Sequence, residues 1–233
     1  MLVFLLVQLM RKIFTGVQWN KLIHLVKNGL FKLKYLATFL LISMISPGVV
    51  ENTSEHVEFE ILNKDRIIGF INIDKRIEGT RTTYQVASRV ETKLLIKFKA
   101  IGNETSVYEN DTLVYSSMYR KVNKKIKVDQ IVEFKDGNYY LNDKQIVDLN
   151  DPKIIRCNLV QLYFDEPVGI SKVYCDKQKR YLNIEPIGEG KYKLQFKKGN
   201  YSVFKYQNGK CISIDAVGTF FKVRLSKTVQ DQS

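Results

Sequence analysis

Polar and apolar residues alternate along most of the chain after residue 50, and this period of two constrains the fold more than any other feature. The alternation is clearest in His56–Ile61, Lys125–Phe134 and Lys191–Lys197. Such segments form strands with one wet and one dry face, which is typical of antiparallel sheets. The second segment changes face near Gln130 and Ile131, which predicts a β-bulge at that point.

Turn residues separate these segments at short intervals. Pairs such as Asp136-Gly137 and Asn208-Gly209 tolerate the positive φ that a two-residue hairpin requires. Strands do not alternate with long helical segments, so a parallel sheet is not expected. The sequence therefore predicts a mainly β fold, with one curved antiparallel sheet forming a half-barrel or open barrel of about 8–12 strands.

One segment, Asp151–Phe164, departs from the alternation. Its apolar residues recur at roughly helical spacing, and Asp151 with Pro152 resembles an N-cap followed by proline at the first helical position. We expect one short helix here, ending at the turn Asp165–Gly169. No linker or internal repeat interrupts the pattern, so residues 51–233 are predicted to form a single antiparallel β domain.

Residues 1–50 have a different character, because they contain no Asp or Glu. Lys32 and Lys34 precede the apolar run Tyr35–Ile45, and the small residues Ser46-Pro47-Gly48 follow. This is the layout of a secretory signal peptide. It predicts an N-terminal hydrophobic helix and an exported domain, periplasmic or extracellular. The alternative is a domain anchored in the inner membrane by residues 35–50.

This apolar run lies well inside the chain, and three explanations are open for the N-terminal extension before it. The start codon is assigned too early, the extension is the long basic region of an uncleaved anchor, or it forms an amphipathic helix on a membrane surface. Trp19, Leu22, Ile23 and Val26 have the spacing that the third explanation needs. Contact with a membrane surface through this segment is therefore expected.

The net charge of +13 also divides between the two parts of the chain. Six of the 37 Lys and Arg residues lie in residues 1–50, which leaves 31 basic against 24 acidic residues, or +7, for residues 51–233. Lysines on outward strand faces also keep sheet edges from associating. The charge therefore does not indicate a nucleic-acid partner.

Residues 51–233 offer little to a catalyst. His56 is their only histidine, which argues against a Ser-His-Asp triad and against a zinc site. Cys157, Cys175 and Cys211 show no paired spacing, and we expect them to be small buried residues rather than disulfide partners. We expect no metal and no cofactor.

Aromatic side chains are the more informative resource, with 13 Tyr and 13 Phe in the chain. Many fall on the apolar faces of predicted strands, where they either pack the core or line an incompletely filled interior that binds apolar ligands. We predict an exported, non-catalytic binding module that carries or senses a lipid or other apolar ligand in the cell envelope. The alternative is an envelope hydrolase that uses carboxylates such as Glu166.

The segment from Leu162 to Gly169, where the predicted helix returns to the sheet, is the predicted ligand site. Tyr163, Phe164 and Pro167 supply apolar surface, and Asp165 and Glu166 fix the orientation of the ligand. Arg120 and Lys121 would bind an anionic head group if their strand lies alongside. The alternative is that Tyr163 and Phe164 plug the end of the barrel.

Several short phrases, taken in order, resemble an uncharacterised family of exported bacterial β-proteins. The resemblance spans roughly Glu55 to Leu225, and the family has no established activity, so it implies no catalytic residues. Its implied fold is similar to the curved antiparallel half-barrels of lipoprotein carriers, which hold a lipid tail in their concave face. The phrases are Arg66–Phe70, Leu113–Ser117, Leu162–Gly169, Val173–Asp176 and Tyr206–Gly209.

Overall fold

The computed structural model describes residues 52–92, 98–145, 149, 153–218 and 221–228. The chain divides into two compact units, Met1–Val49 and Val50–Ser233, and only the second contains described residues. The predicted hydrophobic helix and signal peptide lie outside the described residues. Within the described part of the chain, no helix is long and apolar enough to span a membrane.

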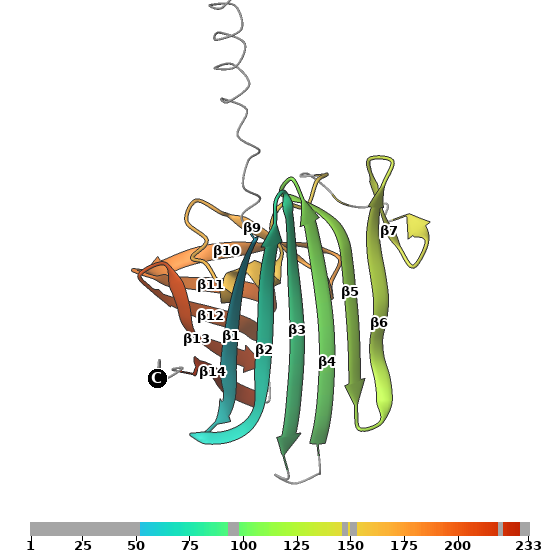
Figure 1. Ribbon diagram of the computed structural model, residues 1–233. Coiled ribbons are helices and arrows are strands. Elements are labelled where there is room, and N and C mark those ends of the chain that lie inside the picture. Colours follow the sequence, from blue (N-terminus) through green and yellow to red (C-terminus); the bar gives the residue numbers. More distant parts are fainter. Residues whose placement is uncertain (1–51, 93–97, 146–148, 150–152, 219–220, 229–233) are drawn as a thin grey trace, which may run out of the picture. The chain divides into compact units, whose positions relative to one another are not determined.

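Fourteen antiparallel strands form a single sheet (Figure 1). The order is β8-β7-β6-β5-β4-β3-β2-β1-β14-β13-β12-β11-β10-β9, so β1–β8 and β9–β14 are two meanders joined where β1 pairs with β14. The strands are β1 Asn52–Asn63, β2 Arg66–Glu78, β3 Arg81–Thr92, β4 Phe98–Glu109, β5 Thr112–Val122, β6 Lys125–Lys135, β7 Asn138–Leu141, β8 Lys144–Gln145, β9 Lys172–Cys175, β10 Arg180–Gly188, β11 Lys191–Lys197, β12 Asn200–Gln207, β13 Lys210–Gly218 and β14 Phe221–Lys227.

The predicted curved antiparallel sheet is confirmed. It has more strands than expected because β7, β8 and β9 are only two to four residues long, too short for the alternation to reveal. The predicted turn chemistry is present as well. Asn208 and Gly209 have φ values of 51° and 74°, and Asp136 and Gly137 have 51° and 75°, as tight hairpin turns require.

The alternation also identifies the core. On β1, Val57, Phe59 and Ile61 are buried while the residues between them are not. The predicted bulge at Gln130 and Ile131 is wrong. The register between β5 and β6 shifts elsewhere, between Ile126 and Val128 of β6. Gln130 faces inward as a buried polar residue and Ile131 is exposed, so the pattern broke at a polar core position rather than at a bulge.

The only helix among the described residues is η1, a 3-10 helix of five residues, Leu159–Tyr163. It is shorter than predicted, and the expected N-cap pair at 151 and 152 lies outside the described residues. The backbone before η1 is extended because its polar groups bond to strands. Ile155 O accepts from Leu113 N at 2.9 Å, Ile155 N donates to Tyr139 Oη at 3.0 Å, and Cys157 O accepts from Tyr174 N at 2.9 Å.

A buried polar cluster joins this segment to both meanders, and we call it the seam cluster: Ser106, Ser116, Gln130, Asn158 and Asp176. Asp176 accepts from Ser116 Oγ at 2.5 Å and from Asn158 Nδ2 at 3.0 Å. Asn158 Nδ2 also donates to Ser106 Oγ at 2.9 Å, and Gln130 Nε2 donates to the Asp176 carbonyl at 2.8 Å. The cluster therefore connects β4, β5 and β6 to the residue that follows β9.

The carboxyl of Asp176 has no cationic partner among the described residues. Burial raises its pKa to about 6, although the hydrogen bond from Ser116 opposes the rise; the negative charge of Glu104 adds to it. A buried carboxylate held only by neutral donors is costly to ionise. The seam cluster is thus a structural tie whose strength depends on pH.

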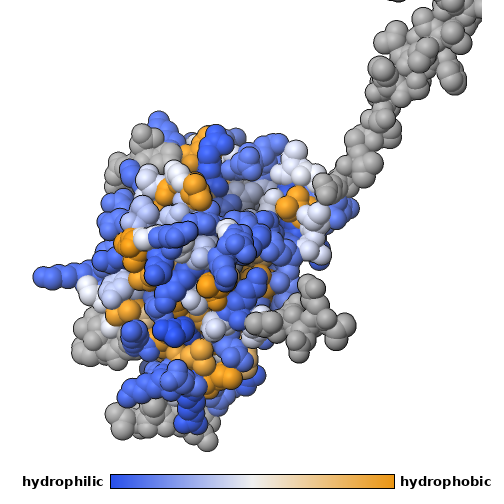
Figure 2. Space-filling view, turned by 90° about the vertical axis from the view of Figure 1, so that its left-hand side faces the viewer, coloured by the Kyte–Doolittle hydropathy of each residue, from blue (hydrophilic) through white to orange (hydrophobic). Residues whose placement is uncertain are grey.

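The surface of the sheet shows no single large apolar face in the view of Figure 2. Apolar side chains lie there in small separate patches among hydrophilic ones. Isolated exposed apolar residues are normal on a protein surface. A concave region is therefore a better candidate for a binding site than this surface.

Candidate functional site

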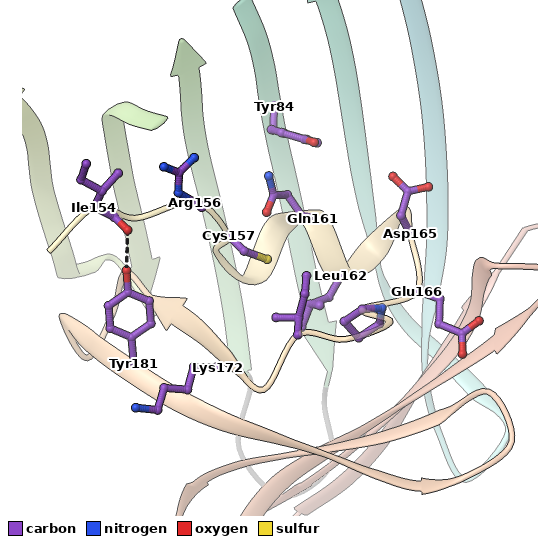
Figure 3. A pocket seen from close by; sticks show the side chains of 12 residues that line it. Tyr84, Ile154, Arg156, Cys157, Gln161, Leu162, Asp165, Glu166, Lys172 and Tyr181 are labelled. Atoms are coloured by element: carbon purple, nitrogen blue, oxygen red, sulfur yellow. Dashed lines mark hydrogen bonds between the residues drawn. The ribbon is translucent and has the colours of Figure 1, made fainter. Parts of the chain in front are cut away.

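A pocket of about 420 Å³ lies between β3, the segment that carries η1, and strands β9 and β10 (Figure 3). Its volume falls within the range of small-molecule sites, about 300–1,000 Å³. Tyr84 comes from β3, Cys157 and Leu162 from the η1 segment, and Pro167 and Ile170 from the turn that follows. Mainly apolar atoms line this pocket, as in most ligand sites.

The thiol and the phenol on this lining are uncharged at neutral pH. Burial raises the pKa of Cys157 to about 12, so its thiol stays protonated and is a poor nucleophile. Burial also raises the pKa of Tyr84, and a hydrogen bond with Gln161 only partly opposes this. The lining therefore suits an uncharged, apolar part of a ligand.

Two carboxylates border one end of the pocket, and both have partners. Asp165 accepts from Lys210 Nζ at 2.6 Å and from Lys75 Nζ at 3.2 Å, while Glu166 accepts from Tyr192 Oη at 2.9 Å. Desolvation alone would raise the pKa of Asp165, but the bonds from the two lysines outweigh it and lower that pKa. The charge of Asp165 is therefore balanced by lysines, whereas the partner of Glu166 is an uncharged phenol.

Two cations border the pocket away from these carboxylates: Arg156 and Lys172 (Figure 3). Asn158 and Tyr174 form a parallel bridge, and Arg156 and Lys172 each lie two residues before a bridged residue. Figure 3 places the two cations on different walls of the pocket, Arg156 on the η1 segment and Lys172 on β9, with their side chains pointing away from each other. Among the described residues, neither forms an ion pair or a side-chain hydrogen bond.

A hydrogen bond links the two walls at this basic end. Tyr181 Oη on β10 donates to the carbonyl of Ile154 at 3.1 Å, drawn as the dashed line in Figure 3. The bond keeps the start of the η1 segment against β10. The basic end is therefore built on fixed backbone rather than on a free loop.

The predicted site residues divide between the pocket and the core. Glu166 and Pro167 line the pocket, as do their neighbours Leu162 and Asp165. Phe164 is buried, and its ring centroid lies 5.6 Å from that of Tyr84. Phe164 thus supports the pocket wall from behind without lining it.

Tyr163 and Arg120 lie elsewhere. The ring of Tyr163 packs against Phe59 and Phe204, with centroid distances of 5.7 and 6.3 Å. Arg120 bonds Glu104 on the neighbouring strand, with Nε 3.2 Å from Oε1. A bound molecule in this pocket would not touch either residue directly, and their role in ligand binding stays a prediction.

Sequence reasoning missed Arg156, Lys172, Tyr84 and Tyr181. Arg156 fell in a predicted helix, where a lone charge indicates a solvated face. Lys172 begins β9, and a lysine at the end of a strand is ordinary surface composition. Both cations border one pocket because the η1 segment packs on β9 through the bridge between Asn158 and Tyr174, and no local pattern encodes a pairing between segments of this kind.

The chemistry available in the described residues is limited. No group of three His, Cys, Asp or Glu side chains is placed to hold a metal ion there. Cys157, Cys175 and Cys211 are free thiols, and burial raises the pKa of each. A glycosidase-type pair needs one carboxyl kept protonated, and Asp165, with its lowered pKa, does not meet that need.

The chain belongs to a family defined as a domain of unknown function, DUF6134, whose model matches residues 59–228. The predicted resemblance to an uncharacterised β family is therefore confirmed. Among solved structures, the chain is similar to a β-barrel-like protein of domain of unknown function DUF1849 from Brucella abortus. The identity is 13%, the TM-score is 0.47, and the match covers 77% of this chain and 98% of the other. No curated protein matches.

Proposed function

We propose that this domain is a non-catalytic binding module that holds the apolar part of a small molecule, such as a lipid tail, in the pocket beside η1. The observation that carries the proposal is the apolar lining of a 420 Å³ pocket whose thiol, phenol and carboxylates are all neutral or already partnered. Burial of apolar ligand surface against such a lining is favourable by about 25 cal/mol per Å². The lining presents few groups that could act as an acid, base or nucleophile.

Export is part of the same proposal. The lysine-apolar-small pattern from Lys32 to Gly48 supports placement of the domain beyond a membrane, where lipids are abundant. N-terminal sequencing of the protein recovered from cells tests it. Cleavage near Gly48 is the expected result, and a full-length cytosolic product would contradict it.

A pocket-filling variant tests the binding proposal. Ile170 lines the pocket and is partly exposed, so Ile170→Trp should fill it without disturbing the core. Ile187→Trp on β10 is the matched control, because Ile187 is also exposed and does not line the pocket. With 1-decanol as an uncharged apolar probe in calorimetry, the wild type and Ile187→Trp should bind and Ile170→Trp should not. Equal binding by both variants, or none by the wild type, would refute the proposal.

Glu166→Gln separates this proposal from an envelope hydrolase. Because the carboxylate of Glu166 accepts one hydrogen bond from Tyr192, the amide keeps an acceptor oxygen and the shape of the pocket. A binding module should retain 1-decanol binding in this variant. A hydrolase that uses Glu166 as acid, base or nucleophile should lose turnover on envelope glycan or lipid.

A further inference from the structure

We propose that the pocket selects amphipathic anions: molecules with an apolar tail and a single carboxylate head, which one of the two cations at the basic end, Arg156 or Lys172, binds. This inference rests on the proposed function and adds the class of head group. It stands on the place of the two cations in the pocket lining, on their lack of partners among the described residues, and on the internal partners of the carboxylates at the opposite end.

The two ends of the pocket are unequal in the charge they offer a ligand. Asp165 forms ion pairs with two lysines, and Glu166 accepts a hydrogen bond from a tyrosine, so both carboxylates have partners within the protein. Arg156 and Lys172 face the same pocket with their donors unused by other described residues. The net attraction at the mouth is therefore for negative charge.

The chemistry of the two cations fits a carboxylate. An arginine guanidinium presents two parallel donors that match the two oxygens of a carboxylate, and a lysine adds a compact charge. At the edge of an apolar lining, either cation favours a head group that stays near water while its tail is buried. An uncharged head such as an alcohol gains the tail contacts only.

The expected size follows from charge-assisted hydrogen bonds, which are stronger than neutral ones but weakened at a rim open to solvent. We therefore expect decanoate to bind about tenfold more tightly than 1-decanol. Sodium acetate, which has the head without the tail, should show no saturable binding. Added salt should weaken decanoate binding and leave 1-decanol unchanged.

The test compares decanoate and 1-decanol by calorimetry on the whole chain. Arg156→Gln with Lys172→Gln should remove the tenfold preference and leave 1-decanol binding intact. Lys177→Gln with Lys198→Gln is the charge-matched control, because both lysines are exposed and neither lines the pocket. That control should keep the preference, which excludes a general effect of net charge.

Each outcome decides between the two claims. Equal affinity of decanoate and 1-decanol for the wild type overturns the anion inference and leaves the binding function standing. A preference that survives in Arg156→Gln with Lys172→Gln overturns the assignment to these residues. Failure of the wild type to bind either probe overturns the proposed function itself.

Discussion

The seam cluster and the basic end of the pocket are built from the same short stretch of chain, yet they use polar groups in opposite ways. In the seam, Asn158 and Asp176 are buried, and their side chains bond to partners inside the protein. At the pocket, Arg156 lies two residues before Asn158 and Lys172 lies four residues before Asp176, and neither has a partner among the described residues. Polar groups bonded internally hold the fold, whereas those left without partners are available for a ligand.

The largest difference should come from the titration of Asp176. A raised carboxyl pKa means that the folded state binds the proton more tightly than the unfolded chain. The contribution of Asp176 therefore favours folding at low pH and is lost as pH rises from near 4 to about 6, above which it is constant. Relative to Asp176→Asn, the free energy of unfolding of the wild type should fall by on the order of 2–3 kcal/mol between pH 4 and pH 7.

Urea unfolding of both proteins at several pH values measures this difference. Other carboxylates cancel in the comparison, including Asp165 and Asp215, whose lowered pKa values act in the opposite direction. If the free energy of unfolding changed with pH in the same way for both proteins, ionisation of Asp176 would not destabilise the fold, and this prediction would be contradicted.

The next effect in size concerns Asn158, whose amide joins Ser106 and Asp176. Asn158→Ala leaves a buried carboxylate with one donor fewer, and the free energy of unfolding should fall by about 2 kcal/mol. Asn183→Ala on the exposed face of β10 is the matched control and should change it by less than about 0.5 kcal/mol. Equal effects of the two substitutions in urea unfolding would remove the structural role of the seam.

The smallest effect should come from the pocket. Because Arg156 and Lys172 have no partner among the described residues, changing both to Gln should alter the free energy of unfolding by less than about 0.5 kcal/mol. If the free energy of unfolding measured in urea fell by 2 kcal/mol or more, the two cations would stabilise the fold as the seam cluster does, and the distinction between the two regions would be wrong.

The sequence predicted the sheet better than the site, for physical reasons that particular residues make clear. The burial of Val57, Phe59 and Ile61 is predictable from the sequence because a strand has a local period of two. Glu166 and Pro167 were predicted at the site because a turn beside aromatic residues is visible in the sequence, and they line the pocket.

Tertiary pairing explains the residues that the sequence did not reveal. Gln130 reads as a break in the alternation, yet it is a buried member of the seam that bonds a residue 46 positions away. Residues 153–157 have helical spacing, but strands on both sides supply their hydrogen bonds, and this competition overrides local propensity. Arg156 and Lys172 border one pocket because the bridge between Asn158 and Tyr174 holds their two segments together.

The most direct test of this division is ligand-induced stabilisation, measured by urea unfolding with and without decanoate at ten times its Kd for the wild type. Binding to the folded state alone should add about 1.4 kcal/mol to the wild type. Asn158→Ala should be less stable in both conditions and keep that gain, while Arg156→Gln with Lys172→Gln should match the wild type without ligand and lose most of the gain. The account would be contradicted if the seam variant lost the gain while folded, or if the pocket variant kept it in full.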